Sequence, residues 1–303
     1  MKRVLTQEAG PDVIYPADRA GRLPAWLRRD IPDARAREFG RCLADSGVST
    51  VCVEAHCPNI ARCFRRNTAT FLILGKTCTR SCRFCIVQEA DRHPLPVDTE
   101  EPRRICAAIE RFGIMDAVIT SVTRDDLPDG GAGQFARVIA SVRALVPPRF
   151  VEVLIPDFLG SRESLRIVAR AQPDVIAHNI ETVRRLYPCV RPQADYRRSL
   201  EVLKTLKDLA PAVITKSSLM LGLSEKEEEV VEAMQELRQV DCDCLMLGQY
   251  LAPSSRHISV KEFIEPRVFQ RYKGLALAMG FKTVVSGPFV RSSYRGEDRG
   301  DIP

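Results

Sequence analysis

The sequence predicts an α/β protein built on a parallel sheet, and three observations support this class. From residue 70 onward, short apolar runs typical of strands alternate with longer stretches whose apolar residues recur every three or four positions. Repeated strand–helix units of this kind produce parallel strands. The chain has 303 residues, 45% of them hydrophobic, which is enough for one substantial core. Composition alone does not separate an open barrel from a doubly wound sheet.

The elements are expected in the following order. Residues 1–66 show no strong alternation and are rich in arginine and proline, so we expect an extension that wraps the catalytic unit, with one short helix near residues 32–44. Six strands are expected at residues 70–74, 117–120, 151–155, 174–178, 213–221 and 244–248. Helical patterns are clearest at residues 101–112, 135–145, 199–209, 225–240 and 265–279. Ligands of parallel α/β folds gather at the carboxyl ends of the strands, where several polar motifs of this sequence fall.

Composition and charge argue against several classes of protein. No run approaches the roughly 20 apolar residues of a membrane span, and residues 1–16 lack the character of a transit peptide. Eleven cysteines without a secretory segment favour a reduced, cytoplasmic protein over a disulfide framework. The net charge of +6 indicates a solvated basic surface or attraction to an acidic partner. Its basic residues are dispersed and few aromatics interleave with them, which disfavours nucleic-acid binding.

Three cysteines follow the first predicted strand: Cys78, Cys82 and Cys85, at spacing C-x3-C-x2-C. A [4Fe–4S] cluster takes up to four thiolates, so a loop that offers three leaves one iron open to an outside ligand. Arg80 and Arg83 of the same loop can offset the negative charge of such a cluster. Zinc or redox cysteines are the alternative, although no histidine has the spacing to these thiols that zinc sites usually show.

This loop, with Phe84 before its third cysteine, resembles the signature of the radical S-adenosylmethionine (SAM) enzymes. The resemblance implies that the open iron binds the amino and carboxylate groups of SAM. It also implies that Cys78, Cys82 and Cys85 are catalytic, because their cluster passes the electron that breaks SAM into methionine and a 5′-deoxyadenosyl radical. The fold implied is a partial (βα)6 TIM-like barrel with an N-terminal extension and a C-terminal segment.

A second cysteine group lies in the extension: Cys52, Cys57 and Cys63, at spacing C-x4-C-x5-C. Near the other end, the motif Arg291-Ser292-Ser293-Tyr294 supplies hydroxyl groups in a stretch without hydrophobic periodicity. These two motifs and the signature loop, in this order, resemble the lipoyl synthases. The likeness continues through residues 24–27, 54–59, 124–131, 154–158, 178–182, 215–217 and 248–250, so it covers nearly the whole chain.

The resemblance implies a second [4Fe–4S] cluster, held by Cys52, Cys57, Cys63 and a serine of the R-S-S-Y motif, Ser293 in preference to Ser292. In the family this auxiliary cluster is consumed as the sulfur donor. A hydroxyl oxygen binds iron less firmly than a thiolate, which we interpret as a way to let one iron leave. The implied parts of the chain are an extension at residues 1–66, a radical SAM barrel at residues 67–285 and a C-terminal segment at residues 286–303.

Polar residues at predicted strand ends are candidates for binding SAM. Asp129, Gly130 and Gly131 lie between a strand and a helix, where small residues let the backbone approach a ligand. An ordinary strand-to-helix turn is the alternative, and the resemblance favours the methionine end of SAM. Asn179 and Glu181 can bond the hydroxyls of a ribose, or they can cap the next helix.

Three further residues are expected to contact the substrate. Lys216 interrupts an apolar strand, and a buried lysine is unusual unless it is paired, so we expect it to face a carboxylate in the active site. Tyr250 and Arg256 follow the last predicted strand and are expected near the substrate entrance.

The resemblance implies an enzyme that inserts two sulfur atoms, at C6 and C8 of an octanoyl chain on a protein lysine, to make the lipoyl group. Such carbons need a radical, because an alkyl C–H has no useful acidity for a general base. The implied partners are an octanoylated lipoyl domain or glycine-cleavage H protein and an electron donor such as ferredoxin or flavodoxin, with no nucleic acid and no membrane. Two alternatives stand beside this function: radical SAM sulfur insertion into a free small molecule, and a non-catalytic iron–sulfur protein.

Overall fold

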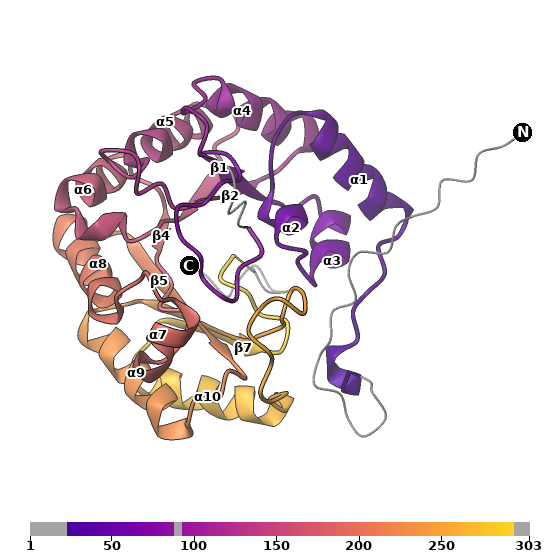
Figure 1. The fold of residues 1–303 in the computed structure, drawn as a ribbon. Helices are drawn as coiled ribbons and strands as arrows, with labels where there is room; N and C mark the ends of the chain where they lie inside the picture. The colour runs from indigo at the N-terminus through magenta and orange to yellow at the C-terminus, as the bar shows by residue number, and fades with distance from the viewer. Residues whose placement is uncertain (1–22, 88–92, 294–303) are drawn as a thin grey trace, which may run out of the picture.

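The computed structural model describes residues 23–87 and 93–293, which form a curved parallel sheet with helices on its outer side (Figure 1). The sheet has seven strands in the order β1 to β7, each parallel to the next. No pairing joins β1 to β7 among the residues described, so the barrel is open. The strands are β1 (Thr70–Ile73), β2 (Asp116–Ser121), β3 (Phe150–Leu154), β4 (Val175–Ala177), β5 (Ile214–Leu221), β6 (Cys244–Gln249) and β7 (Thr283–Gly287).

Most helices follow the strand–helix alternation and lie in an arc outside the sheet, as Figure 1 shows. These are α4 (Glu101–Phe112), α5 (Ala132–Arg143), α6 (Arg162–Arg170), α8 (Tyr196–Leu209), α9 (Glu227–Gln239) and α10 (Pro266–Ala278). The short helix α7 (Tyr187–Val190) follows β4. The extension supplies α1 (Ala34–Asp45), α2 (Val51–Glu54) and α3 (Ile60–Arg65), which lie beside β1 (Figure 1).

The structure confirms the α/β class and the open barrel, but it adds one strand, β7, and four α-helices, α2, α3, α6 and α7, that the sequence patterns did not predict. Strand β7 has only two large apolar residues, Val284 and Val285, which is too short a pattern to stand out. It crosses the expected boundary between residues 285 and 286, so the sheet ends at Gly287. Helix α6 is nine residues long and mostly polar, although it buries Leu165 and Val168.

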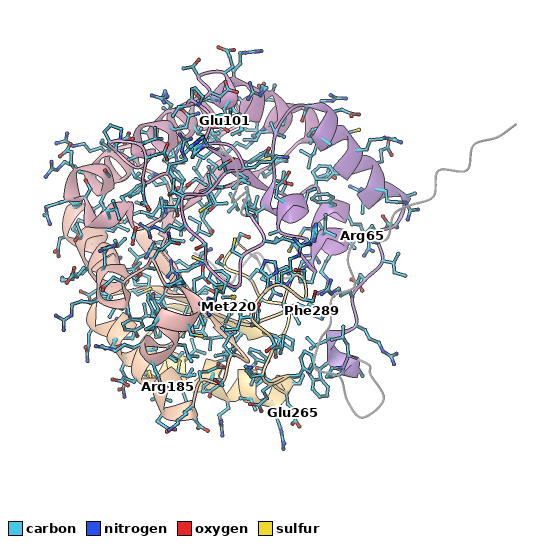
Figure 2. All side chains as sticks on the ribbon, viewed as in Figure 1. Arg65, Glu101, Arg185, Met220, Glu265 and Phe289 are labelled. Carbon is cyan, nitrogen blue, oxygen red and sulfur yellow. The ribbon has the colours of Figure 1, made fainter. Side chains whose placement is uncertain are left out.

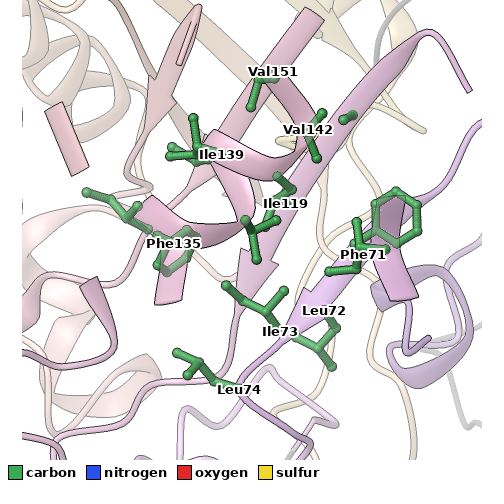
Figure 3. Packing of buried hydrophobic residues seen from close by; sticks show 14 of the residues in the cluster. Phe71, Leu72, Ile73, Leu74, Ile119, Phe135, Ile139, Val142 and Val151 are labelled. Carbon is green, nitrogen blue, oxygen red and sulfur yellow. The ribbon is translucent and has the colours of Figure 1, made fainter. Parts of the chain in front are cut away.

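The core between the sheet and the outer helices explains why these segments fold as they do. All four residues of β1 are buried, as expected for a parallel strand covered on both faces. Helix α5 buries Phe135, Ile139 and Val142, whose spacing of three and four places them on one face. Figure 3 shows these side chains packed with residues of the neighbouring strands.

The extension is fixed to the edge of the sheet at β1. Leu72 donates a backbone hydrogen bond to the carbonyl oxygen of Ser49, at 2.9 Å, and Thr50 bridges to Phe71. Asp33 caps α1 by accepting from the Ala36 N–H, and it also pairs with Arg65 of α3 at 2.8 Å. The first cysteine group is thereby held beside β1, with Cys52 next to Thr70 at the start of the strand.

Lys216 of β5 and Glu152 of β3 form an ion pair in which both side chains are 0% exposed. A buried charge that loses its partner is strongly destabilising, whereas replacing both charges with apolar groups is often neutral. We expect Lys216→Met or Glu152→Leu alone to lower the free energy of unfolding by about 3–5 kcal/mol, and the double variant to recover most of that loss. Denaturant unfolding of the two single variants and the double variant measures the loss and the recovery.

The exposed pair Arg103–Glu100 provides the matched control for that experiment. Glu100→Gln is expected to change stability by less than about 0.5 kcal/mol, because exposed ion pairs contribute little. If the single changes at Lys216 and Glu152 lowered the free energy of unfolding no more than this control does, the buried ion pair would not be important for stability.

Candidate active site

One cavity of about 430 Å³ lies at the carboxyl ends of the strands and collects motifs from the whole chain. Its lining combines an apolar inner wall, which includes Leu72, Val122, Leu154 and Met220, with polar groups and thiols. The predicted cluster ligands that border it are Cys57, Cys78, Cys82, Cys85, Ser292 and Ser293. Figure 2 labels Met220 on the inner side of the barrel. The structure therefore brings the two cysteine groups and the serine motif to one place; Tyr294 lies outside the described residues.

The loop that carries Cys78, Cys82 and Cys85 is tied down on both sides. Thr79 donates its backbone N–H to the carbonyl oxygen of Thr123, at 3.0 Å, and Arg83 donates to that of Val190, at 2.9 Å. Burial, together with the nearby thiols of Cys82 and Cys78, raises the pKa of Cys85 to about 12. The three thiols are thus close enough to interact, and a metal that binds Cys85 would have to displace its proton.

Arg80 anchors this loop and does not serve as the free charge that the sequence suggested. Its guanidinium, 4% exposed, bonds Asp125 at 2.7 and 2.9 Å and Asp157 at 2.7 and 3.0 Å. Burial favours the neutral acid of Asp157, but the hydrogen bonds and charge of Arg80 outweigh it and lower its pKa to about 2. With two carboxylates bound, Arg80 has little charge left to offset that of a cluster.

We expect Arg80→Met to reduce the iron that the signature loop binds about tenfold under limiting iron, because groups that orient metal ligands typically contribute 10- to 100-fold in affinity. Iron analysis and the spectrum of the reduced cluster measure this. Arg83→Met, an exposed position in the same loop, is the control and should load normally. If both variants bound iron normally, Arg80 would not be needed to anchor the signature loop.

The upstream cysteines lie around α2 and α3. Cys57 borders the cavity, while Cys52 is buried and Cys63 half-buried beside it. Burial raises the pKa of Cys52 to about 12 and that of Cys63 to about 11, and the charge of Cys57 adds to both shifts. Of these three thiols, Cys57 is the one that lines the cavity.

The arrangement of the thiols can be compared with the two kinds of metal site that the sequence left open. Among the described residues, no three His, Cys, Asp or Glu side chains converge closely enough to hold a single metal ion. A cube of iron and sulfide is larger than one ion, and its thiolate ligands surround it rather than meet at a point. Two groups of three interacting thiols, of which Cys57, Cys78, Cys82 and Cys85 border one cavity, fit such clusters better than tetrahedral zinc.

The segment after β4 presents unsatisfied polar atoms to the cavity. His178 bonds the carbonyl oxygen of Ile155 through Nδ1, at 3.0 Å, and leaves Nε2 buried without a partner. Burial and the charge of Arg191 lower the pKa of His178 to about 4, so the ring is neutral and Nε2 is an acceptor. Asn179 likewise leaves Oδ1 unpartnered. Buried polar atoms of this kind normally have partners, which indicates a polar ligand.

Glu181 completes this group of acceptors. Its backbone φ is 64°, an uncommon conformation for a residue with a side chain. Backbone hydrogen bonds to Ser218 and from Met220, at 2.9 and 2.8 Å, hold it there. Burial raises the pKa of Glu181, and Arg191 partly opposes the shift. Neither His178 nor Arg191 was a predicted site residue, and only the motif around Asn179 pointed toward His178.

Asp129, Gly130 and Gly131 do not border the cavity. A Cβ on Gly130 would lie 2.8 Å from Phe158, and one on Gly131 would lie 2.3 Å from Leu74, so close packing requires both glycines. The Asp129 carboxylate accepts from the N–H groups of Gly131 and Gly133, both at 2.8 Å, at the start of α5. These residues shape the turn into α5.

The three predicted substrate residues occupy different places. Tyr250 borders the cavity and donates its hydroxyl to the carbonyl oxygen of Ile258, at 2.7 Å. Arg256 is exposed on the loop after β6, near the cavity-lining Pro253. Lys216 does not border the cavity, because it points to Glu152 deeper in the barrel.

Comparison with known proteins agrees with this geometry. Residues 72–237 match the radical SAM superfamily model. Among solved structures, HydG, a maturase of the [FeFe]-hydrogenase, aligns with a TM-score of 0.57 at 17% identity over 70% of this chain and 50% of that one. Methylornithine synthase (PylB) aligns with a TM-score of 0.52 at 15% identity over 76% and 75%. The fold and the cysteine loop thus define a radical SAM enzyme, which uses SAM and an iron–sulfur cluster.

The sequence relatives are more specific. The lipoyl synthase of Caldanaerobacter subterraneus subsp. tengcongensis is 52% identical, over 91% of this chain and 96% of that protein. The lipoyl synthase of Geobacter sulfurreducens is 53% identical, over 92% and 91%. The chain belongs to the lipoyl synthase family, and it is a sulfur-inserting radical SAM enzyme. None of the helices in residues 23–87 and 93–293 is both long and apolar enough to cross a membrane.

Proposed function

We propose that this chain makes the lipoyl group with two [4Fe–4S] clusters that share one cavity. The observation that carries the proposal is that Cys57, Ser292 and Ser293 border the same cavity as Cys78, Cys82 and Cys85. One cluster would be held by Cys78, Cys82 and Cys85, and the other by Cys52, Cys57, Cys63 and Ser293 or, less favoured, Ser292. When bound with SAM, the first supplies a radical that takes hydrogen from an alkyl carbon, and the second supplies sulfur.

The chain's own residues bind and orient the reactants. Nε2 of His178 and Oδ1 of Asn179 are available to accept hydrogen bonds from the hydroxyls of SAM, beside the Glu181 carboxylate. The apolar wall excludes water and fits an alkyl chain. Tyr250 closes the cavity near the loop that carries Arg256. Asp129, Gly130, Gly131 and Lys216 support this site from outside it.

The proposal is tested by anaerobic reconstitution with iron and sulfide, followed by reductant, SAM and an octanoyl-lysine peptide. Mass spectrometry should detect lipoyl peptide together with 5′-deoxyadenosine. Deoxyadenosine with an unchanged peptide, under conditions where both clusters are loaded, would contradict the proposed substrate. Absence of both products would contradict the catalytic function.

The carrier and the reductant extend this proposal. We infer an acidic octanoylated carrier, a lipoyl domain or a glycine-cleavage H protein, and a ferredoxin or flavodoxin as electron donor, all in the cytoplasm, where thiols stay reduced. Arg83 and Arg256 are exposed on two loops that meet near the cavity, where the Ile258 N–H bonds the Arg83 carbonyl oxygen at 3.1 Å. These arginines are positioned to attract an acidic protein.

We expect the double change Arg83→Glu and Arg256→Glu to raise KM for an acidic octanoylated carrier roughly tenfold at low salt, because rim charges govern encounter. High salt should reduce the difference, since it screens exposed charges. KM for the octanoyl-lysine peptide serves as the control and should stay unchanged. A carrier KM that is insensitive to both salt and charge reversal would contradict this docking face.

A further inference from the structure

The segment at residues 288–293, here called the strap, lies across the carboxyl end of β6. The backbone N–H of Gln249 donates to the carbonyl oxygen of Pro288, at 3.3 Å, and that of Val290 donates to Gly287, at 3.0 Å. The Val290 side chain is buried with Met246 and Val285. This course brings Ser292 and Ser293 to the cavity.

Gly248 of β6 allows the strap to lie this close. A Cβ at residue 248 would stand 2.0 Å from the carbonyl oxygen of Val290 and 3.0 Å from its carbonyl carbon. No real side chain tolerates such contacts, so any residue other than glycine would push the strap away from the sheet.

Asn59 holds the strap from the opposite side. It occupies the N-cap position of α3, where asparagine usually bonds its own helix, yet its side chain makes no capping bond. Instead, Nδ2 donates to the carbonyl oxygen of Phe289, at 2.7 Å, across 230 residues of sequence. Asn59 is 5% exposed, so little water competes for this bond. Figure 2 labels Phe289 on the same side of the molecule as the extension helices.

We propose that Asn59 is a positioning residue that, with Gly248, fixes the strap against the first cysteine group. It follows Cys57 by two positions, so one turn of chain both supplies a cavity thiol and holds the segment with the serines. The inference rests on the proposed function for its chemical purpose: a hydroxyl is a weak iron ligand and must be held in place to compete with water.

Hydrogen exchange in the reconstituted full-length enzyme tests the positioning directly. Asn59→Ala should accelerate exchange at the Gln249 and Val290 amides about five- to tenfold, because one buried hydrogen bond that resists local opening is lost. Gly248→Ala should also accelerate exchange at these two amides, because the added Cβ would push the strap away from β6. Asn67→Gly is the matched control: Asn67 also donates its amide to a phenylalanine carbonyl, that of Phe112 at 3.2 Å, and its φ of 53° suits glycine.

Unchanged exchange at Gln249 and Val290 in Asn59→Ala, or equal acceleration in Asn67→Gly, would overturn the inference. A second readout separates it from the proposed function: the rate at which a chelator removes iron from the auxiliary cluster. If Ser293 or Ser292 is a ligand, Asn59→Ala should accelerate this loss about tenfold, and adding Ser293→Ala and Ser292→Ala should add little. Faster exchange with unchanged iron loss would support the strap while contradicting ligation by serine.

Discussion

Cys82→Ala is expected to abolish the cleavage of SAM and, with it, all lipoyl formation. The variant should retain about four of the eight irons that two clusters hold, because only the signature loop loses a ligand. The two other thiols of that loop, Cys78 and Cys85, are already proposed ligands of the same cluster and cannot replace the lost one. Iron analysis and deoxyadenosine release with excess reductant measure the two effects.

Cys189→Ala is the appropriate control for this change, since Cys189 is exposed and lies outside both cysteine groups. It should keep full iron and full activity. If Cys82→Ala still released deoxyadenosine at the normal rate, the electron would have to enter SAM elsewhere, and the function given to the signature loop would be wrong.

Cys57→Ala is expected to separate the two halves of the reaction. The signature loop is unaffected, so deoxyadenosine should still form, whereas lipoyl product should be lost because no sulfur reaches the alkyl chain. Cys57 is the informative position, because Cys52 and Cys63 do not border the cavity while Cys57 does. Product analysis by mass spectrometry, with deoxyadenosine measured in the same reaction, distinguishes this from general inactivation.

Cys106→Ala is a matched control for Cys57→Ala, because Cys106 is also half-buried but packs against the core as a small apolar residue. Its expected cost is a small loss of stability without change in the ratio of the two products. Parallel loss of deoxyadenosine and lipoyl product in Cys57→Ala would contradict separate functions for the two cysteine groups.

The repeating part of the fold could be predicted from sequence because each unit carries its own pattern. Helix α4 was expected at 101–112 and occupies Glu101–Phe112, since its apolar face and its following Gly113 define both ends. Strand β7 was missed, because its identity depends on pairing with β6 rather than on a long apolar run. The place of β7 at the edge of the sheet can therefore be seen only in the tertiary structure.

The candidate site also has a part that the sequence predicts and a part that only the structure shows. Cysteine spacing identified both thiol groups, because a cluster loop imposes short, regular intervals. The placement of Lys216 depended on a partner 64 residues away, Glu152, which no local pattern reveals. Arg80 was misinterpreted for the same reason: its carboxylates, Asp125 and Asp157, lie 45 and 77 residues along the chain. Sequence patterns identify the groups, and packing decides which of them face the cavity.

In the proposed mechanism both cysteine groups serve one cavity, where one initiates the radical and the other yields sulfur. The most direct measurement is a single turnover without free sulfide, after reconstitution with isotopically labelled sulfide, on an octanoyl-lysine peptide. Labelled sulfur at both C6 and C8, lost in Cys57→Ala while deoxyadenosine persists, is the predicted result. Lipoyl peptide with unlabelled sulfur, or labelled product from Cys57→Ala, would contradict the account.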